Sequence, residues 1–292
     1  MTPAAGAGDG GGAGASSAAL AWPRFPLGGG GALVGAAAVF SAGGGGGSAG
    51  SAAAALGAKK VYAVEPTPLV EVARALVAAN GLGDRVTVLQ GTVQSLKPRK
   101  VDLIFSELLN ADPFLEEVTE AMGAASAWLV PGGHMAPSRL RVYGALVRDQ
   151  GSAQEVRRAT REINTMGQRL GLNVEPVLQA LSKPAPYRYV ASTVQLCSAP
   201  TLLFDLPLGG GEAPPEQLQA THIGSQADIV GGVAVWFEAE YDEGLVLHNA
   251  PGQGGHWGQL VCAWPEERGV AEGQAVVVQV NVTEDGLEVG LG

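Results

Sequence analysis

The chain has 292 residues, of which 46% are hydrophobic, and its 18 basic and 28 acidic side chains give a formal net charge of −10. This length and hydrophobic content allow one large domain or two ordinary ones with a packed core, which excludes a wholly disordered protein. Because no basic block occurs along the chain, we expect no direct nucleic-acid partner, whereas a cationic substrate would be attracted.

Residues 1–30 consist mostly of Gly, Ala, Ser and Pro, which predicts a low-complexity disordered arm. From residue 31 to residue 137, apolar strand-like runs alternate with segments of helical spacing. Strands are expected at residues 32–40, 59–65, 85–91 and 101–107, and helices at residues 48–56 and 68–83. This alternation predicts an α/β domain with a doubly wound parallel sheet.

The pattern changes in residues 138–292, where a β-rich domain is expected. Antiparallel strands are predicted within residues 140–149, 232–249 and 275–291, and the Asp285-Gly286 pair is a strong signal for a hairpin turn. Residues 153–181 form a polar, partly amphipathic insertion with helical spacing.

No apolar run reaches the roughly 18–20 residues of a membrane span, so no membrane partner is expected. Asp9 precedes the first arginine, Arg24, which argues against an organelle transit peptide. Cys197 and Cys262 lie far apart and match no metal or redox spacing, so we expect no metal site and a reducing compartment, cytoplasmic and/or nuclear.

A glycine run after the first predicted strand contains two overlapping patterns. Gly43-x-Gly45-x-Gly47 is typical of a nucleotide-binding methyltransferase loop, and Gly45-x-Gly47-x-x-Gly50 fits the dinucleotide fingerprint. Glu65 ends the second predicted strand, where its carboxylate could accept hydrogen bonds from both ribose hydroxyls of an adenosine. Low complexity alone is the other explanation of such a run.

Four carboxylates, those of Glu107, Asp112, Glu116 and Glu117, follow the buried run at residues 101–105. Ligands gather at the carboxyl ends of strands in open α/β sheets, so this position predicts a ligand site. Glu116 and Glu117 could equally form a solvated helix N-terminus, where acids complement the helix dipole. Asp112 and Glu117 are interpreted as solvated surface charges.

Three segments resemble protein arginine methyltransferases: GAKKVYAVE at residues 57–65, SELL with Glu107 and Glu116, and residues 236–261, which include His256-Trp257. The resemblance runs from about residue 39 to the C-terminus. It implies a Rossmann-like methyltransferase sheet that binds S-adenosylmethionine (residues 31–137), followed by a β-barrel substrate domain. Residues 153–181 would correspond to that family's helical dimerisation arm.

The same resemblance implies roles for individual residues. The positions expected to bind the cofactor S-adenosylmethionine are Gly43, Gly45 and Gly47 at its methionine end, Glu65 at its ribose, and Val93 and Gln94 at its adenine. The family often has an acid where Gln94 stands.

By the same resemblance, Glu107 and Glu116 would bind the guanidinium of an arginine-containing protein, which receives a methyl group. Two carboxylates can hold this planar cation bidentately and offset its repulsion by the sulfonium of the methyl donor. His256 would orient a glutamate or help to remove the released proton, although a lone histidine is often structural. Gly255 replaces the threonine of the family's Thr-His-Trp loop.

Two departures favour an alternative hypothesis. Ser41 stands where the family usually has an acid, and residues 1–38 contain no tyrosine of the kind that the family's helices before the first strand carry. The chain is therefore expected to be a divergent or N-terminally truncated member, and a catalytically inactive binding or dimerisation module is the alternative. A nicotinamide-dependent oxidoreductase is a third hypothesis, but it leaves the paired glutamates and His256 unexplained.

Two further expectations concern assembly and the site. An apolar face in the helical insertion predicts a homodimer, its members being Val156, Ile163, Met166, Leu170 and Leu172. Glu107 and Glu116 should lie close together, so at least one should have a raised pKa without substrate. His256 is expected against the same pocket.

Overall fold

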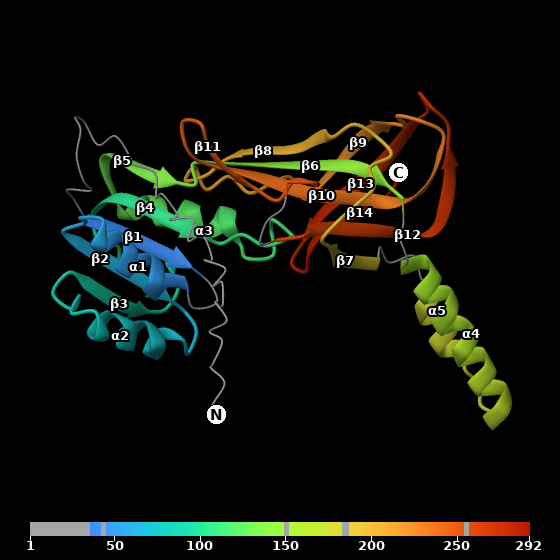
Figure 1. The fold of residues 1–292 in the computed structure, drawn as a ribbon, viewed down its shortest axis with the longest axis horizontal. Coiled ribbons are helices and arrows are strands. Elements are labelled where there is room, and N and C mark those ends of the chain that lie inside the picture. The colour runs from blue at the N-terminus through green and yellow to red at the C-terminus, as the bar shows by residue number, and fades with distance from the viewer. Residues whose placement is uncertain (1–35, 42–44, 149–151, 183–186, 254–256) are drawn as a thin grey trace, which may run out of the picture.

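The structure is a computed structural model that describes residues 36–41, 45–148, 152–182, 187–253 and 257–292. The predicted disordered arm, residues 1–30, lies outside the described residues, as do Gly43 and His256. In Figure 1 an α/β unit lies at one end of the molecule and a β-rich unit at the other.

The α/β unit contains a single five-stranded sheet in the order β3-β2-β1-β4-β5, in which every neighbouring pair is parallel. Its strands are β1 (Ala36–Ser41), β2 (Lys60–Glu65), β3 (Val86–Gln90), β4 (Val101–Glu107) and β5 (Leu129–Ala136). Its helices are α1 (Gly45–Ala55), α2 (Val70–Ala79), α3 (Val118–Ala125) and the 3₁₀ turn η1 (Ser126–Trp128). The predicted parallel sheet is confirmed.

Both faces of this sheet are covered, as β1 illustrates. Ala37 and Val39 pack in the cluster that contains Ala53 and Ala54 of α1, whereas Ala38 packs in the cluster that contains α3. Successive side chains of a strand point to opposite faces, so α1 and α3 lie on opposite sides of the sheet. This burial on both faces explains the nearly continuous apolar strands.

The glycine run has a packing role in the first turns of α1. A Cβ atom added to Gly47 would lie 2.5 Å from the Cβ of Ala73 in α2, and one added to Gly50 would lie 3.0 Å from the Cβ of Ala63 in β2. Only glycine therefore permits this close approach of α1 to its neighbours. Low complexity alone does not account for these positions.

The β-rich unit is barrel-like and consists of two antiparallel sheets (Figure 1). One has the order β7-β12-β10-β6-β8 with β11 added to β10, and the other has the order β14-β13-β9. The first sheet comprises β6 (Arg139–Val147), β7 (Tyr187–Ala191), β8 (Thr201–Pro207), β10 (Asp228–Asp242), β11 (Leu245–His248) and β12 (Gln259–Val270). The second comprises β9 (Gln217–Ile223), β13 (Ala275–Thr283) and β14 (Gly286–Leu291).

The hairpin predicted at Asp285-Gly286 joins β13 to β14. Thr283 pairs with Gly286, and the φ angle of Gly286 is +102°, a value that favours glycine. The prediction of this turn is confirmed.

One hydrophobic core runs through both units. Phe237 of β10 and Leu287 of β14 pack in the same cluster as Val118 and Met122 of α3, and all four side chains are buried. Fully burying such a side chain contributes roughly 1.5–3 kcal/mol, so the continuous core fixes the barrel-like unit against the α/β unit.

The predicted helical insertion is confirmed as two helices, α4 (Ser152–Leu170) and α5 (Glu175–Ser182). Figure 1 shows them projecting from the barrel-like unit. Among the described residues, no helix combines the length and the apolar character needed to cross a membrane.

Candidate active site

The ends of three neighbouring strands form the base of the site. Ser41 of β1 pairs with Glu107 of β4, and Phe40 of β1 pairs with Val64 of β2, so Ser41, Glu65 and Glu107 end their strands at one level. Because the strands are parallel, these residues share the carboxyl edge of the sheet, where ligands bind in folds of this kind.

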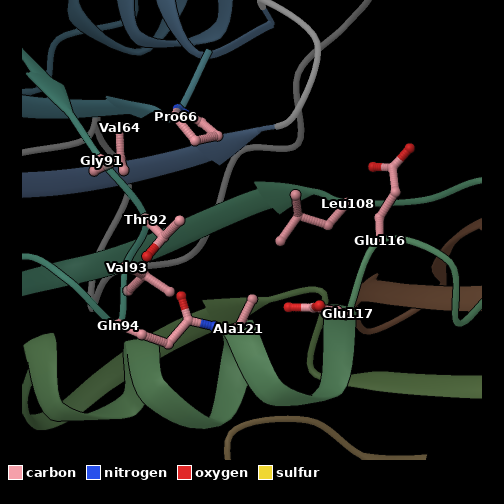
Figure 2. A pocket seen from close by; sticks show the side chains of 10 residues that line it. All are labelled: Val64, Pro66, Gly91, Thr92, Val93, Gln94, Leu108, Glu116, Glu117 and Ala121. Atoms are coloured by element: carbon pink, nitrogen blue, oxygen red, sulfur yellow. The ribbon is translucent and has the colours of Figure 1, made fainter. Parts of the chain in front are cut away.

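A pocket opens at this edge between the sheet and α3 (Figure 2). Its lining comes from the ends of β2 and β4, the turn after β3 and the start of α3. The lining residues are Val64, Pro66, Gly91, Thr92, Val93, Gln94, Leu108, Glu116, Glu117 and Ala121. The pocket thus brings together three residues predicted from the sequence, Val93, Gln94 and Glu116, which come from two distant segments.

Glu65 lies beside this pocket at the end of β2 and is fully buried. Its Oε1 accepts hydrogen bonds from the backbone nitrogen of Thr67, at 3.0 Å, and from the Thr67 hydroxyl, at 2.5 Å. A buried carboxylate is costly unless it is hydrogen-bonded, and these two donors hold its orientation. The side chain is therefore preorganised at the sheet edge.

The pKa values of both Glu107 and Glu116 are raised. Both residues are half-buried. Burial is the main cause that raises the pKa of Glu107 to about 7, and the negative charge of Glu116 raises it further. Burial also raises the pKa of Glu116, and a hydrogen bond from Asn110 opposes that rise. The expected raised pKa is confirmed, with desolvation as a larger cause than the neighbouring charge.

The two consecutive glutamates before α3 point in different directions. Glu117 has φ 51° and ψ 38°, the one non-glycine residue with positive φ in the described chain, and α3 begins at Val118. Figure 2 shows the Glu117 carboxylate turned toward Ala121 and Gln94, whereas Glu116 is directed away from them. The Asn110 side chain donates a 3.2 Å hydrogen bond to Glu116. A solvated helix N-terminus therefore describes exposed Glu117 but not Glu116.

The interpretation of Asp112 as a solvated surface charge is wrong. Asp112 is 5% exposed, and its carboxylate accepts hydrogen bonds from the backbone nitrogens of Phe114, at 3.1 Å, and Leu287, at 2.8 Å. Arg188 of β7 forms an ion pair with it at 3.3 Å. Two of these partners lie in the barrel-like unit, so nothing near Asp112 in the sequence indicates its burial.

Tyr241 was not predicted as a site residue, yet it contacts the strand end that carries Glu107. Its hydroxyl donates a 2.8 Å hydrogen bond to the carbonyl oxygen of Ser106, and its ring centroid lies 5.4 Å from that of Phe105. Burial, followed by the charge of Glu107, raises the pKa of Tyr241. Local periodicity contains no signal for this contact between residues 135 positions apart.

The remaining predicted site residues are only partly described. Gly45 and Gly47 occupy the first turn of α1, whose backbone nitrogens lack partners within the helix. Gly43 and His256 lie outside the described residues, so their predicted roles stay predictions. Beside His256, the partly buried ring of Trp257 packs edge-on against Phe237 at 5.7 Å. No group of three or more potential metal ligands occurs in the described parts of the chain.

The fold and the site define a methyltransferase-type α/β sheet joined to a barrel-like unit. Residues 40–136 match the family described as "Methyltransferase domain". Among curated proteins, the chain is 27% identical to protein arginine N-methyltransferase PRMT10 of Arabidopsis thaliana, over 74% of this chain and 64% of that protein. It is 28% identical to a probable histone-arginine methyltransferase CARM1 of Oryza sativa subsp. indica, over 77% of this chain and 45% of that protein.

Solved structures share the fold of this chain. The crystal structure of Arabidopsis thaliana protein arginine methyltransferase 10 matches with a TM-score of 0.73 and 24% identity, covering 88% of this chain and 83% of that one. A Trypanosoma brucei PRMT1 enzyme–prozyme heterotetrameric complex with AdoHcy matches with a TM-score of 0.69 and 20% identity, over 87% and 84%. The chain is therefore similar to protein arginine N-methyltransferases in sequence over about three quarters of its length, and to solved structures of such enzymes in fold. It spans less than two thirds of the length of these curated relatives.

Proposed function

We propose that the protein transfers a methyl group from S-adenosylmethionine to a guanidinium nitrogen of arginine in a protein substrate. The observation that carries the proposal is the pair of half-buried glutamates, Glu107 and Glu116, at the carboxyl edge of a parallel sheet. The pKa of Glu107 is raised to about 7, mainly by burial and further by the charge of Glu116, so a negative charge on Glu107 is unfavourable there without a cation.

The residues around the pocket fit the adenosine part of the cofactor. Val64, Val93, Leu108 and Ala121 provide apolar walls against which a flat ring can pack. The Gln94 amide carries both a donor and an acceptor, the combination that an adenine edge requires. The preorganised Glu65 carboxylate is suited to accept hydrogen bonds from ribose hydroxyls. When bound, S-adenosylmethionine supplies an electrophilic methyl group on a sulfonium.

Glu107 and Glu116 would bind the arginine side chain. A guanidinium stays protonated at neutral pH and presents a planar set of donors that matches two carboxylates. Binding would offset the repulsion between the glutamates and hold one guanidinium nitrogen toward the methyl group, an effect worth several kcal/mol. That nitrogen would receive the methyl group, which would leave S-adenosylhomocysteine, and would then lose a proton.

Side chains of the protein would also remove the proton that the methylated nitrogen releases. The Glu107 carboxylate, which a bound guanidinium keeps in its charged form, would accept this proton once the methylated nitrogen releases it. The sequence-based role of His256 in orienting a glutamate or removing this proton is part of the same proposal. The cytoplasmic or nuclear location stays a prediction.

We also propose that the protein is a homodimer that associates through the arm formed by α4 and α5. In this arm, Met166 is 48% exposed, Leu170 64% and Leu172 57%. Exposed apolar side chains gathered on one projecting arm mark a protein–protein contact more often than isolated ones do. The T. brucei relative forms a heterotetrameric enzyme–prozyme complex, which supports association in related proteins.

The test is methyl transfer from S-adenosylmethionine to an Arg-Gly-rich peptide by the purified protein. We expect activity in the native chain and a loss of about 100-fold or more in Glu107→Gln and Glu116→Gln, because each removes half of the guanidinium-binding pair. Undiminished activity in Glu107→Gln would contradict the role of that residue.

Calorimetry with S-adenosylhomocysteine separates the proposal from the alternative hypothesis. Tight binding together with methyl transfer supports the enzyme. Binding without transfer to any arginine peptide would favour a catalytically inactive module. No binding at millimolar ligand would contradict the assignment of a cofactor site as well.

A further inference from the structure

The segment that carries both glutamates, residues 107–117, is here called the substrate loop. It connects β4 of the α/β unit to α3, and Asp112 lies near its middle. Asp112 Oδ1 accepts the backbone hydrogen of Phe114 at 3.1 Å, which sets the turn inside the loop. The other oxygen, Oδ2, has its partners outside the loop.

Two elements of the barrel-like unit converge on that oxygen. Leu287, the second residue of β14, donates its backbone N–H to Asp112 Oδ2 at 2.8 Å. Arg188 of β7 donates to the same oxygen at 3.3 Å, and the same guanidinium nitrogen also donates to the carbonyl oxygen of Leu287 at 3.3 Å. The loop is therefore tied to two strands that lie 76 and 175 residues farther along the chain.

The hairpin turn is shaped to admit this carboxylate. A Cβ atom at Gly286 would lie 2.1 Å from Asp112 Oδ2 and 3.0 Å from Arg188 Nη1. Glycine is required at this position for two reasons. Its φ is +102°, and a side chain there would clash with the Asp112–Arg188 pair. The hairpin turn at Gly286 and the Asp112–Arg188 pair therefore fit each other sterically.

An ion pair with a buried carboxylate and a partly buried guanidinium is an expensive way to join two units if stability is its only purpose. Desolvation of the charges offsets much of their attraction, and apolar packing of similar volume often stabilises as well or better. Phe114 of the loop already packs edge-on against Phe204 of β8, with ring centroids 5.1 Å apart. Apolar burial is non-directional, whereas hydrogen bonds to fixed backbone groups also set the orientation of the Asp112 carboxylate.

We infer that Asp112, together with Arg188 and the backbone of Leu287, is a positioning residue that fixes the substrate loop so that Glu116 and Glu107 face one guanidinium. This inference rests on the proposed function. The two glutamates are only nine positions apart, and Asp112 is five residues from Glu107 and four from Glu116. A shift of the loop against the barrel-like unit would therefore move Glu116 relative to Glu107.

The main test variant is Asp112→Asn, which keeps the size of the side chain and an acceptor oxygen but removes the charge that pairs with Arg188. We expect kcat/KM for an Arg-Gly-rich peptide to fall roughly 10- to 100-fold, as for a misplacement of about 1 Å. The Kd for S-adenosylhomocysteine should stay within about twofold, because Glu65 and Gln94 are not in the network.

A double-mutant cycle distinguishes positioning from a general structural effect. If Asp112 acts through Glu116, Asp112→Asn should cause little further loss in a Glu116→Gln background. Losses that multiply fully in the double variant would overturn the inference. If Asp112→Asn does not fold, Arg188→Lys, which keeps the charge but loses the planar fork, takes its place in the same cycle.

Asp228→Asn is the matched control. The side chain of Asp228 is also little exposed, at 3%, and it is paired with an arginine, Arg148. It begins β10, thirteen residues before Tyr241, roughly 40 Å away along a straight strand. We expect a loss of stability with unchanged kcat/KM; equal losses of kcat/KM in the Asp112 and Asp228 variants would contradict the inference.

Hydrogen exchange tests the inference independently of activity. Backbone amides of residues 108–117 should exchange faster in Asp112→Asn than in the native chain, while those of β1 and β2 should not change. If the native chain transfers no methyl group, only the proposed function is contradicted. If the amide exchange rates of residues 108–117 are unchanged in Asp112→Asn, only the positioning role is contradicted.

Discussion

The hydroxyl of Tyr241, in the barrel-like unit, donates a 2.8 Å hydrogen bond to the carbonyl oxygen of Ser106, the residue before Glu107. Both residues are buried, so this carbonyl depends on a protein donor. The barrel-like unit thereby holds the strand end from which Glu107 projects.

We predict that Tyr241→Phe lowers the free energy of unfolding by about 1–3 kcal/mol, because it leaves a buried carbonyl without its donor. It should also lower kcat/KM for methyl transfer, since the end of β4 loses a support. Chemical denaturation and peptide methylation measure the two effects. In the control, Tyr143→Phe, the lost hydroxyl contacts Glu238 at 3.0 Å instead, and kcat/KM should not change.

The raised pKa of Glu107 predicts a pH dependence of substrate binding. With a pKa of about 7, Glu107 is half protonated at neutral pH, and a bound guanidinium should favour its charged form. Affinity for an arginine peptide should therefore rise as pH increases through 7 and then level off. Calorimetry in two buffers of different ionisation enthalpy should detect proton release on binding near pH 7. Proton release that persists in Glu107→Gln would assign it to another group.

The same group affects stability with the opposite sign. Its pKa in the folded chain, about 7, is higher than its ordinary value of 4.5, so between these values the folded chain binds more protons than the unfolded chain. The contribution of Glu107 to the free energy of unfolding should therefore decrease as pH rises from about 4.5 to 7. Thermal melts of the native chain and Glu107→Gln across this range measure the difference, and parallel curves would contradict it.

Glu65→Gln should weaken binding of S-adenosylhomocysteine roughly 10- to 100-fold, because hydrogen bonds to a charged group contribute about 1.5–3 kcal/mol. The substituted amide can still accept the hydrogen bonds from Thr67, so the fold should persist. Titration calorimetry gives the Kd. Glu71→Gln on α2, where the acid is 72% exposed, is the control and should bind normally. Equal affinities in all three proteins would remove Glu65 from the cofactor site.

Charges placed on the arm should separate the proposed dimer. Light scattering at micromolar concentration should give a dimer for the native chain and a monomer for the double variant Met166→Glu, Leu170→Glu, because burying two carboxylates in an apolar contact is strongly unfavourable. Gln168→Glu adds a charge on the opposite side of α4 and should leave the dimer intact. A native monomer would refute the proposal.

Local sequence was sufficient for the type and order of most elements. The apolar runs that became β1, β2 and β3 alternate with segments of helical spacing, and right-handed crossovers of that kind admit few arrangements other than a parallel sheet. Asp285-Gly286 predicted its hairpin because the required φ is a property of the turn residues themselves. Glu65 and Glu107, which end strands, and Gln94, which follows one, could be placed at one sheet edge because the pattern identifies those strands.

Only the tertiary structure decided which acids are buried and what they contact. Asp112 and Glu117 look alike in sequence, yet Asp112 is buried against Arg188 and Leu287 while Glu117 stays exposed at the pocket. The contacts of Asp112 and Tyr241 join residues 76 to 175 positions apart, and no periodicity within one element depends on such distant partners. The barrel-like unit must dock before desolvation and hydrogen bonding can distinguish these side chains, and that docking depends on the core shared by both units.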